Sequence, residues 1–319
     1  MTNRALVADP TTALTMRLAE VPEPDPKPGQ LVIAVHHVSL NHGDLNDARS
    51  GRIPPGGVLG SDVAGVVVRA ADDGTGPQAG DRVVALAQGA FAERVAVDTA
   101  SVATVPASVD LSLAAAVPVA GLAALRTLRA WGSLLGKRVL ITGASGGVGT
   151  FAVQMAAAAG AHVIASVGAV ERGAGLREVG ADEIVVGLDD VAQPVDVVLD
   201  NVGGPHLVKA WSLLTAGGSL QSIGWTSGEP AIFHPYATVG PAKTLSSYLT
   251  FGDAGPDLTA LVHLVATGVV TVQIGWRGSW EQVSDVVDAM RGRRLSGKAV
   301  LDVAAPGSTG TAAATENSA

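Results

Sequence analysis

The sequence contains no cysteine, which excludes disulfides, thiolate catalysis, cysteine-ligated zinc and iron–sulfur clusters. Aromatic residues make up only 3% of the chain and charged residues 16%, whereas hydrophobic residues reach 47%. Aliphatic side chains must therefore fill the core, and neither a disordered chain nor a coiled coil is expected. Because a domain typically has about 150 residues, a chain of 319 residues is expected to form two domains.

Long apolar runs and basic stripes are also missing. The longest apolar run, residues 113–125, contains Pro118 and Gly121 and is shorter than the roughly 18 residues of a membrane span. The first residues lack the apolar core of a signal peptide. The net charge is −8, so nucleic acid and anionic lipid are poor candidate partners. We therefore expect a globular cytoplasmic protein with neither a nucleic-acid nor a membrane partner.

The pattern of apolar residues changes along the chain. Short valine-rich runs separated by turn residues predict a small barrel or sandwich in the first third; these runs are 31–38, 63–69, 82–87 and 93–97. Beyond residue 111, strands alternate with helices, which indicates βαβ units and a parallel sheet. The expected strands are 138–142, 162–166, 184–186, 195–200, 219–223 and 298–303. The expected helices are two within 111–130, then 148–159, 172–179, 205–214, 257–266 and 280–290.

A glycine-rich loop, residues 143–149, follows one of these strands and opens a helix. Ala144, Gly146 and Gly149 form an A-x-G-x-x-G variant of the dinucleotide fingerprint, in which small residues bring backbone N–H groups to a pyrophosphate. We therefore expect the cofactor to contact the loop at Ala144, Ser145, Gly146, Gly147, Val148 and Gly149.

The same loop contains a second motif. Gly143, Ser145 and Gly147 fit G-x-S-x-G, the nucleophile elbow of serine hydrolases, with Asp200 and a later histidine as possible partners. An elbow leaves Gly149 unexplained and would follow several βαβ units rather than a β-rich segment. The dinucleotide interpretation is favoured, and the hydrolase remains a distant alternative.

The second strand of the parallel sheet indicates which dinucleotide binds. Folds specific for NAD carry an acidic residue about 20 residues after the glycines, but here the strand ends at Ser166 with no acid at its tip. Arg172 follows shortly, and a cation beside small neutral residues suits the 2′-phosphate of NADPH. The alternative is that Arg172 merely solvates the start of a helix.

Many stretches between residues 40 and 301 resemble one family. They include 40–44 (LNHGD), 60–67 (GSDVAGVV), 89–96, 117–128, the glycine loop with its helix, 195–204 (VDVVLDNVGG) and GKAVL from Gly297. The chain resembles a zinc-independent medium-chain dehydrogenase/reductase of the NADPH:quinone oxidoreductase group. The resemblance implies an α/β fold with a Rossmann doubly wound parallel sheet domain and a GroES-like β-rich domain. The implied division is 1–121 with 254–304 for the GroES-like domain and 122–253 for the Rossmann domain. Residues 305–319 are expected to be a disordered tail.

Zinc-dependent relatives place metal ligands at positions that match Asn41, Ser61 and Val119, so the resemblance implies no catalytic zinc. It also implies that Asn41 reaches the nicotinamide and substrate, with Asp44 supporting its loop. The alternative for both is that they cap a short helix starting near Asp44. In the Rossmann domain, Asn201, Val202 and Gly224 lie at strand ends, where ligands bind in open α/β folds.

Two features separate the chain from many relatives. Ile53 stands where they carry a tyrosine, which leaves the proton donor undetermined, and Tyr248 lies on a predicted edge strand that dimerises in relatives. The leading hypothesis is an NADPH-dependent reductase that transfers hydride to a quinone or activated enone and forms a homodimer. Asn41 would donate a hydrogen bond to the developing oxyanion. An enoyl-thioester or biosynthetic tailoring reductase, or a non-catalytic NADPH-binding protein, are the alternatives.

Overall fold

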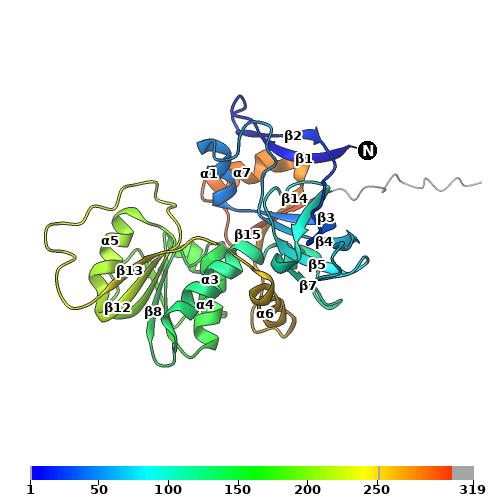
Figure 1. Cartoon of the computed structure of the whole chain (residues 1–319). Coiled ribbons are helices and arrows are strands. Elements are labelled where there is room, and N and C mark those ends of the chain that lie inside the picture. The colour runs from blue at the N-terminus through cyan, green and yellow to red at the C-terminus, as the bar shows by residue number, and fades with distance from the viewer. Residues whose placement is uncertain (1, 251, 304–319) are drawn as a thin grey trace, which may run out of the picture.

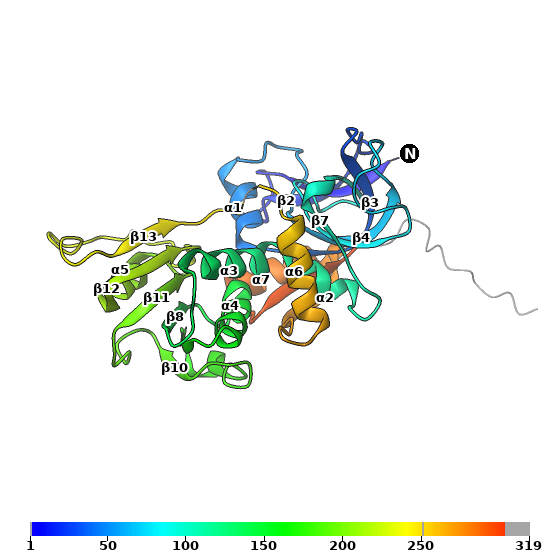
Figure 2. The ribbon, with the colours of Figure 1, turned by 60° about the horizontal axis from the view of Figure 1, so that its bottom comes forward.

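The computed structural model describes residues 2–250 and 252–303, so the tail expected at 305–319 lies outside the described residues. Two lobes, each built on its own large sheet, stand side by side (Figure 1). Strand β1 (Asn3–Ala8) and strand β15 (Lys298–Asp302) belong to the same lobe, so the chain leaves this lobe and returns to it (Figures 1 and 2). No described helix has the length and hydropathy needed to span a bilayer.

The first lobe contains a seven-stranded sheet in the order β14-β15-β3-β4-β5-β7, with β6 also paired to β3. Its pairs are antiparallel except β14–β15. The strands are β3 (Gln30–Leu40), β4 (Asp62–Arg69), β5 (Arg82–Leu86), β6 (Arg94–Asp98), β7 (Val102–Thr104) and β14 (Ile274–Ser279). A hairpin of β1 and β2 (Met16–Val21) lies beside this sheet. The expected β-rich domain is confirmed.

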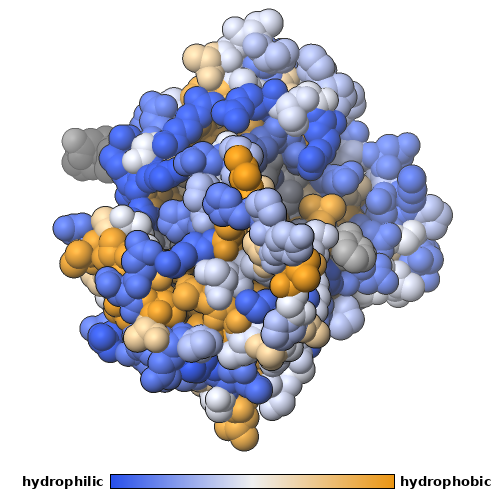
Figure 3. Space-filling model, turned by 90° about the vertical axis from the view of Figure 1, so that its left-hand side faces the viewer, coloured by the Kyte–Doolittle hydropathy of each residue, from blue (hydrophilic) through white to orange (hydrophobic). Residues whose placement is uncertain are grey.

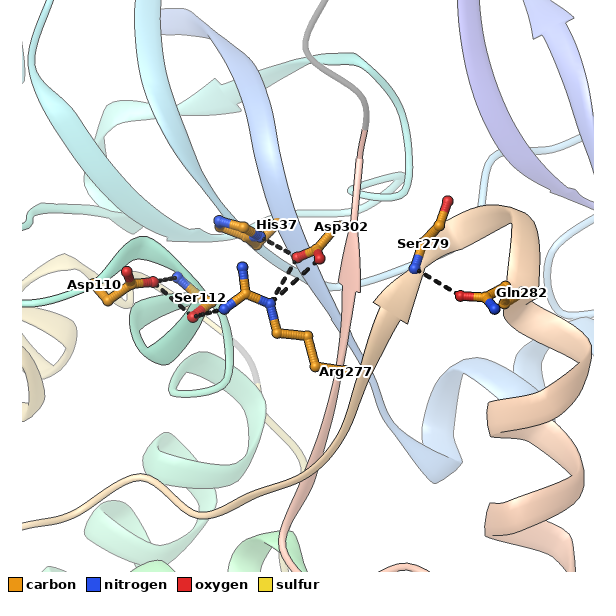
Figure 4. Close-up of polar contacts among 7 residues, drawn as sticks. All are labelled: His37, Asp110, Ser112, Arg277, Ser279, Gln282 and Asp302. Atoms are coloured by element: carbon orange, nitrogen blue, oxygen red, sulfur yellow. Dashed lines mark hydrogen bonds and ion pairs between the residues drawn. The ribbon is translucent and has the colours of Figure 1, made fainter.

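Short helices complete this lobe: α1 (His42–Ser50), α2 (Leu111–Ala115), α7 (Val283–Arg291), η1 (Thr99–Ser101) and η3 (Trp280–Gln282). Arg277 of β14 ties α2 to the sheet (Figure 4). Its guanidinium donates to Asp302 Oδ1 at 3.0 Å and to Ser112 Oγ at 3.0 Å, and Asp302 also contacts His37 Nδ1 at 2.8 Å. This polar cluster fixes the end of β15, the strand that begins at the candidate site described below.

The second lobe contains a six-stranded parallel sheet in the order β10-β9-β8-β11-β12-β13, which is the doubly wound Rossmann order. Its strands are β8 (Arg138–Thr142), β9 (His162–Val167), β10 (Glu183–Val186), β11 (Val195–Asp200), β12 (Leu214–Ser222) and β13 (Thr244–Ser247). Helices α3 (Pro118–Trp131), α4 (Gly147–Ala158) and α5 (Gly204–Leu213) pack against it, with a short 3-10 turn, η2 (Val170–Gly173). Helix α6 (Gly255–Ala266) packs against α3 and against β5, β7 and η1 of the first lobe. The expected α/β fold is confirmed.

Both faces of the parallel sheet are buried, which explains its continuous apolar runs. Along β8, Val139 and Ile141 join the hydrophobic core that contains α3 and α4, whereas Leu140 between them joins the core that contains α5. Alternate residues of one strand therefore pack against helices on opposite faces.

Some expected elements differ in the structure. The helix expected over 172–179 is only the turn η2, because Gly173 and Gly175 interrupt it and Gly175 adopts a left-handed φ of 77°. Strands β1, β2, β7 and β14 are not anticipated by the apolar pattern. Two of the six residues of β14 are glycines, which weaken a strand signal.

Helix α3 contacts both lobes. It packs against β4 and β5 of the first lobe and against α4 and β11 of the second. The predicted domain boundary between residues 121 and 122 falls inside this helix. The division into 1–121 with 254–304 and 122–253 stays a prediction.

Candidate functional site

The glycine loop joins the end of β8 to the start of α4. Gly146 is the N-cap of α4 and offers no capping side chain, so the first N–H groups of the helix, at Gly147, Val148 and Gly149, lack such a partner. A Cβ on Gly149 would lie 2.6 Å from Ala144 Cα and would overlap the carbonyl oxygen of Gly143. The close turn therefore requires glycine and leaves the helix N-terminus available for an anion such as a pyrophosphate.

Residues from the other lobe brace this loop. The backbone N–H of Gly297 donates to the carbonyl oxygen of Ser145 at 2.9 Å, and Gly146 and Gly297 form a bridge. The Ala144 N–H donates to the carbonyl oxygen of Ser166, which is buried at the end of β9. The structure thus brings the predicted residues Ala144, Ser145 and Ser166 together.

Arg172 lies beside the loop but is already engaged. Its Nε donates to Ser145 Oγ at 3.0 Å, and its two terminal nitrogens donate to the carbonyl oxygens of Arg293 and Leu295 at 2.6 and 3.0 Å. Two of its five N–H donors are left for a ligand. Contact between Arg172 and a 2′-phosphate therefore stays a prediction. Through Arg293 and Leu295, Arg172 also connects the two lobes.

Within the described part of the chain, the Ser145 hydroxyl accepts from Arg172 and no histidine contacts it. Asp200, the acid of the hydrolase alternative, instead accepts from Thr142 Oγ1 at 2.6 Å and from the Gly203 N–H at 2.8 Å. Burial raises the pKa of Asp200. A nucleophile needs a base within hydrogen-bond reach, so the hydrolase alternative is wrong.

Asn201 and Val202 lie at the carboxyl end of β11, next to Gly143 of the loop. The Asn201 amide nitrogen donates to the Thr142 carbonyl oxygen at 2.9 Å, but its Oδ1 is buried and has no partner among the described residues. Gly224 follows β12, and a Cβ there would lie 2.8 Å from the Asn201 carbonyl oxygen. An unpaired buried acceptor beside an uncapped helix fits a nucleotide that carries both phosphates and hydroxyl groups.

Trp225, the next residue, packs against protein. A Cβ on Gly203 would lie 2.5 Å from its ring, and its Nε1 donates to the carbonyl oxygen of Glu229 at 2.6 Å. Its side chain holds the loop after β12 against the start of α5.

A polar cluster lies where α1, β4 and β15 meet, next to the glycine loop. Lys298 Nζ is 2.5 Å from Asn41 Oδ1 and 3.1 Å from Asp62 Oδ2, and Asn41 Nδ2 donates to the same Asp62 oxygen at 2.9 Å. Lys298 and Asp62 are 3% and 0% exposed. Asn41 is half-buried, so it is the member of this triangle that a ligand can reach most readily.

The neighbours of Asn41 determine the orientation of its amide. A lysine ammonium can only donate and an ionised carboxylate can only accept, so Oδ1 must face Lys298 and Nδ2 must face Asp62. The second N–H of Nδ2 is directed to the Ser39 carbonyl oxygen at 3.3 Å. Both donors are used, which differs from the expectation that Asn41 donates to a developing oxyanion.

Asp44 combines a capping contact with strong burial. Its Oδ2 accepts from the Asn41 backbone N–H at 2.7 Å, at the N-terminus of α1, and its Oδ1 accepts from Ser61 Oγ at 3.1 Å. Burial, followed by the nearby charge of Asp62, raises the pKa of Asp44 to about 7, although Asn41, Lys298 and Ser61 oppose this shift. Asp44 thus makes the helix-capping contact that the sequence offered as an alternative to a role in the site.

The positions that match zinc ligands in relatives lie around this cluster. Ser61 contacts Asp44, and the Val119 N–H donates to Asp62 Oδ1 at 2.7 Å. Within 2–250 and 252–303, no group of three histidine, cysteine, aspartate or glutamate residues is placed to hold a metal ion. The positive charge in this part of the site is the Lys298 ammonium.

Lys298 and Asp62 are absent from the residues predicted from the sequence. Both stand within motifs that carry the family resemblance, GKAVL and GSDVAGVV, but neither spacing shows that they meet. Their contact depends on β15 returning to the first lobe, 236 residues after β4. The signal that was available is a lysine as the first residue of β15, directly before the apolar residues 299–301.

Two family models match the chain: alcohol dehydrogenase GroES-like domain over residues 27–107 and zinc-binding dehydrogenase over residues 147–267. The human mitochondrial NAD(P)H oxidoreductase RTN4IP1 is 31% identical, with 86% of this chain and 82% of that protein covered. Bovine prostaglandin reductase-3 is 34% identical, with 91% and 85% covered.

Solved structures agree with these relatives. The quinone oxidoreductase from Coxiella burnetii has a TM-score of 0.84 at 23% identity and covers 95% of this chain and 100% of its own, which shows the shared fold. Mycobacterial Rv1454c complexed with NADPH has a TM-score of 0.84 at 25% identity, with 94% and 99% covered. Together with the glycine loop and the two sheets, these findings show that the chain belongs to the medium-chain dehydrogenase/reductase family, within its quinone oxidoreductase group.

Proposed function

We propose that the protein is an NADPH-dependent reductase that delivers hydride directly to a quinone or an activated enone without zinc. Membership of the family makes the protein an oxidoreductase that uses a nicotinamide nucleotide. The cofactor is NADPH, in keeping with the uncapped start of α4, the orphan Asn201 Oδ1 and the cation Arg172 beside Ser145. When bound, NADPH would supply a hydride, that is, one hydrogen nucleus together with its electron pair.

The buried cation Lys298 is the observation that supports a reaction without zinc. The Lys298 ammonium contacts Asn41, at one of the positions that match zinc ligands in relatives, and Asp62, which also accepts from the Val119 N–H at another. A buried lysine cation repels a metal ion, and the asparagine, serine and valine at those positions include no strong zinc ligand. The chain's contribution is therefore to bind and orient the two reactants.

The acceptor class follows from the groups that remain. Ile53 stands where many relatives carry a tyrosine, and it packs into the core of the first lobe. Both N–H donors of the Asn41 amide are already bonded, to Ser39 and Asp62. An acceptor that spreads negative charge through its own conjugation, as a quinone or enone does, requires the least stabilisation from protein donors. Positioning alone can supply about 7–11 kcal/mol of the barrier.

An enoyl-thioester or biosynthetic tailoring reductase is the second candidate, since enoyl thioesters are also conjugated carbonyl compounds. We propose further that the protein acts in the cytoplasm as a homodimer whose partner in the reaction is a small molecule. The free edge of the Rossmann sheet at β13 supports the dimer, because an uncovered edge strand can pair with a second copy.

This function is tested by following NADPH oxidation through its absorbance, with a panel of quinones, enones, enoyl thioesters and simple aldehydes. We expect turnover with quinones or enones and little with aldehydes. A preference for enoyl thioesters would favour the second candidate, and tight NADPH binding without turnover on any acceptor would favour a non-catalytic binding protein. A catalytically active protein that prefers NADH would contradict the assigned cofactor.

A further inference from the structure

We propose that Lys298 is a positioning residue: it fixes the Asn41 amide as a hydrogen-bond acceptor for an N–H or O–H donor of the bound nicotinamide nucleotide. This inference rests on the proposed function, because it requires the cofactor to bind beside the glycine loop and Asn41. It assigns a role to a buried cation that direct hydride transfer does not itself explain.

The contacts of Lys298 form a closed triangle. Its Nζ binds Asn41 Oδ1 at 2.5 Å and Asp62 Oδ2 at 3.1 Å, and Asn41 Nδ2 closes the triangle at 2.9 Å. Rotating the amide by half a turn would place its N–H groups against an ammonium and its oxygen against a carboxylate. Inside a buried cluster, both unpaired contacts would be costly, so the amide has one stable orientation.

The Lys298 side chain also touches the glycine loop. A Cβ on Gly147 would lie 2.8 Å from Lys298 Cδ, so the lysine stem runs along the start of α4. The preceding residue, Gly297, donates to Ser145 within that loop. Lys298 therefore sets the position of Asn41 relative to the backbone that would hold the pyrophosphate.

The orientation of Asn41 restricts its ligand. Its contacts with Lys298, Asp62 and Ser39 leave one hydrogen-bonding capacity unused, the second lone pair of Oδ1, which can only accept. Quinone and enone oxygens also only accept, so they cannot pair with it. The nicotinamide carboxamide has an N–H₂ group and the adjoining ribose has hydroxyls, and either can donate. Asn41 thus orients the nicotinamide end of the cofactor rather than stabilising the reacting oxygen.

Calorimetric titration with cofactor analogues tests this role without depending on turnover. The probes are NADPH, its reduced 3-acetylpyridine analogue, in which methyl replaces the carboxamide NH₂, and an analogue that lacks the 2′-hydroxyl of the nicotinamide ribose. The variants are N41A, K298Q, which keeps an N–H donor, and K298M/D62N, which removes both buried charges together. The matched control is K137M/D196N, another lysine–aspartate pair at the opposite end of β8.

We expect the wild type and the control to bind one analogue about 3- to 10-fold more weakly than NADPH, the loss of one hydrogen bond. This penalty should fall below about 2-fold in N41A and K298M/D62N and should persist in K298Q. If K298M/D62N does not fold, the contrast between N41A and K298Q decides. The analogue that is penalised identifies the donor.

The inference is overturned if the wild type binds both analogues as well as NADPH, or if the penalty is unchanged in N41A or in folded K298M/D62N. Loss of the penalty in K298Q would also overturn it, because that variant retains a donor for Asn41. These outcomes leave the proposed function standing as long as the wild type consumes NADPH with an acceptor. A wild type that binds no NADPH would instead contradict the proposed function.

Discussion

At the scale of single residues, the candidate site differs from the rest of the molecule in the charges that it buries. Lys298 and Asp62 are nearly inaccessible, and Asp44 lies close behind them at 4% exposure. A buried ion pair adds little net stability, but removing one partner alone typically costs about 3–5 kcal/mol. Single substitutions at Lys298 or Asp62 therefore change stability as well as function. The contribution of Asp44 to the free energy of unfolding can be measured separately, because it depends on pH.

Replacing Asp44 with asparagine should change how stability depends on pH. The folded-state pKa of Asp44 is raised to about 7 by burial and by Asp62, above the value of about 3.9 expected in the unfolded chain. Asp44 thus contributes fully to the free energy of unfolding below about pH 4, and this contribution is lost as the pH rises through 7. Relative to D44N, the wild type should lose on the order of 2–4 kcal/mol of unfolding free energy between pH 4 and pH 8.

Denaturant unfolding at several pH values measures this difference. The control is D47N, three residues later in α1, where the carboxylate pairs with Arg52 at 3.0 Å near the surface. The interpretation of Asp44 fails if wild type and D44N show parallel stability profiles over this range.

Arg172→Ala should weaken NADPH binding by about 10-fold and NADH binding much less. A charge-assisted hydrogen bond is worth about 1.5–3 kcal/mol, and the half-buried position of Arg172 favours the lower end. Arg177→Ala is the control, because that guanidinium binds the Asp182 carbonyl oxygen instead of the glycine loop. Equal losses for both cofactors in R172A would show that Arg172 braces the lobes through Arg293 and Leu295 without contacting the 2′-phosphate.

At the scale of elements, local patterns predict the Rossmann lobe well. β8 and β11 have the expected bounds, because short apolar runs between glycines leave little freedom. The glycine loop was predictable from its sequence, because the close backbone approach at Gly149 requires a glycine. The Lys298–Asn41–Asp62 triangle was not, because it depends on how β15 pairs with β3 and on the placement of α1. Hydrogen-bond direction at Asn41 emerges only from that packing.

Gly149→Ala should distort the turn between β8 and α4. The added Cβ would meet the Gly143 carbonyl oxygen and the Ala144 backbone, neither of which is a flexible side chain. We expect a loss of about 1–3 kcal/mol in unfolding free energy, together with weaker NADPH binding. Gly168→Ala is the stability control, because a Cβ there meets nothing within 4 Å; it should change stability by less than about 0.5 kcal/mol. Similar stability of the two variants would contradict the close approach.

At the scale of the whole molecule, the two lobes meet through α3 and through the contacts that Arg172 and Gly297 make between them. The Rossmann sheet ends in β13, where Leu245 is 45% exposed, and Leu249, two residues after this strand, is 68% exposed. Hydrophobic side chains also reach the surface on the side of the molecule that carries α5 and β13 (Figure 3). An edge strand with apolar residues is a surface that proteins usually cover, which supports the proposed homodimer.

Leu245→Lys should dissociate that homodimer, because a cation at the edge strand opposes pairing between two copies. The matched control is Val186→Lys on β10, at the opposite edge of the same sheet and also 45% exposed. Sedimentation velocity should show a dimer for the wild type and V186K and a monomer for L245K. A monomeric wild type, or a dimer in all three proteins, would contradict the assignment of the interface to β13.

The central claim is direct hydride transfer from NADPH without a metal, and an isotope experiment tests it most directly. NADPH deuterated at C4 is oxidised with an enone by protein that has been treated exhaustively with a chelator, and the product is examined for deuterium. We predict deuterium on the β-carbon of the product and the same turnover before and after chelation. Loss of turnover on chelation with recovery on adding zinc, or a product whose β-hydrogen comes from solvent, would contradict the account.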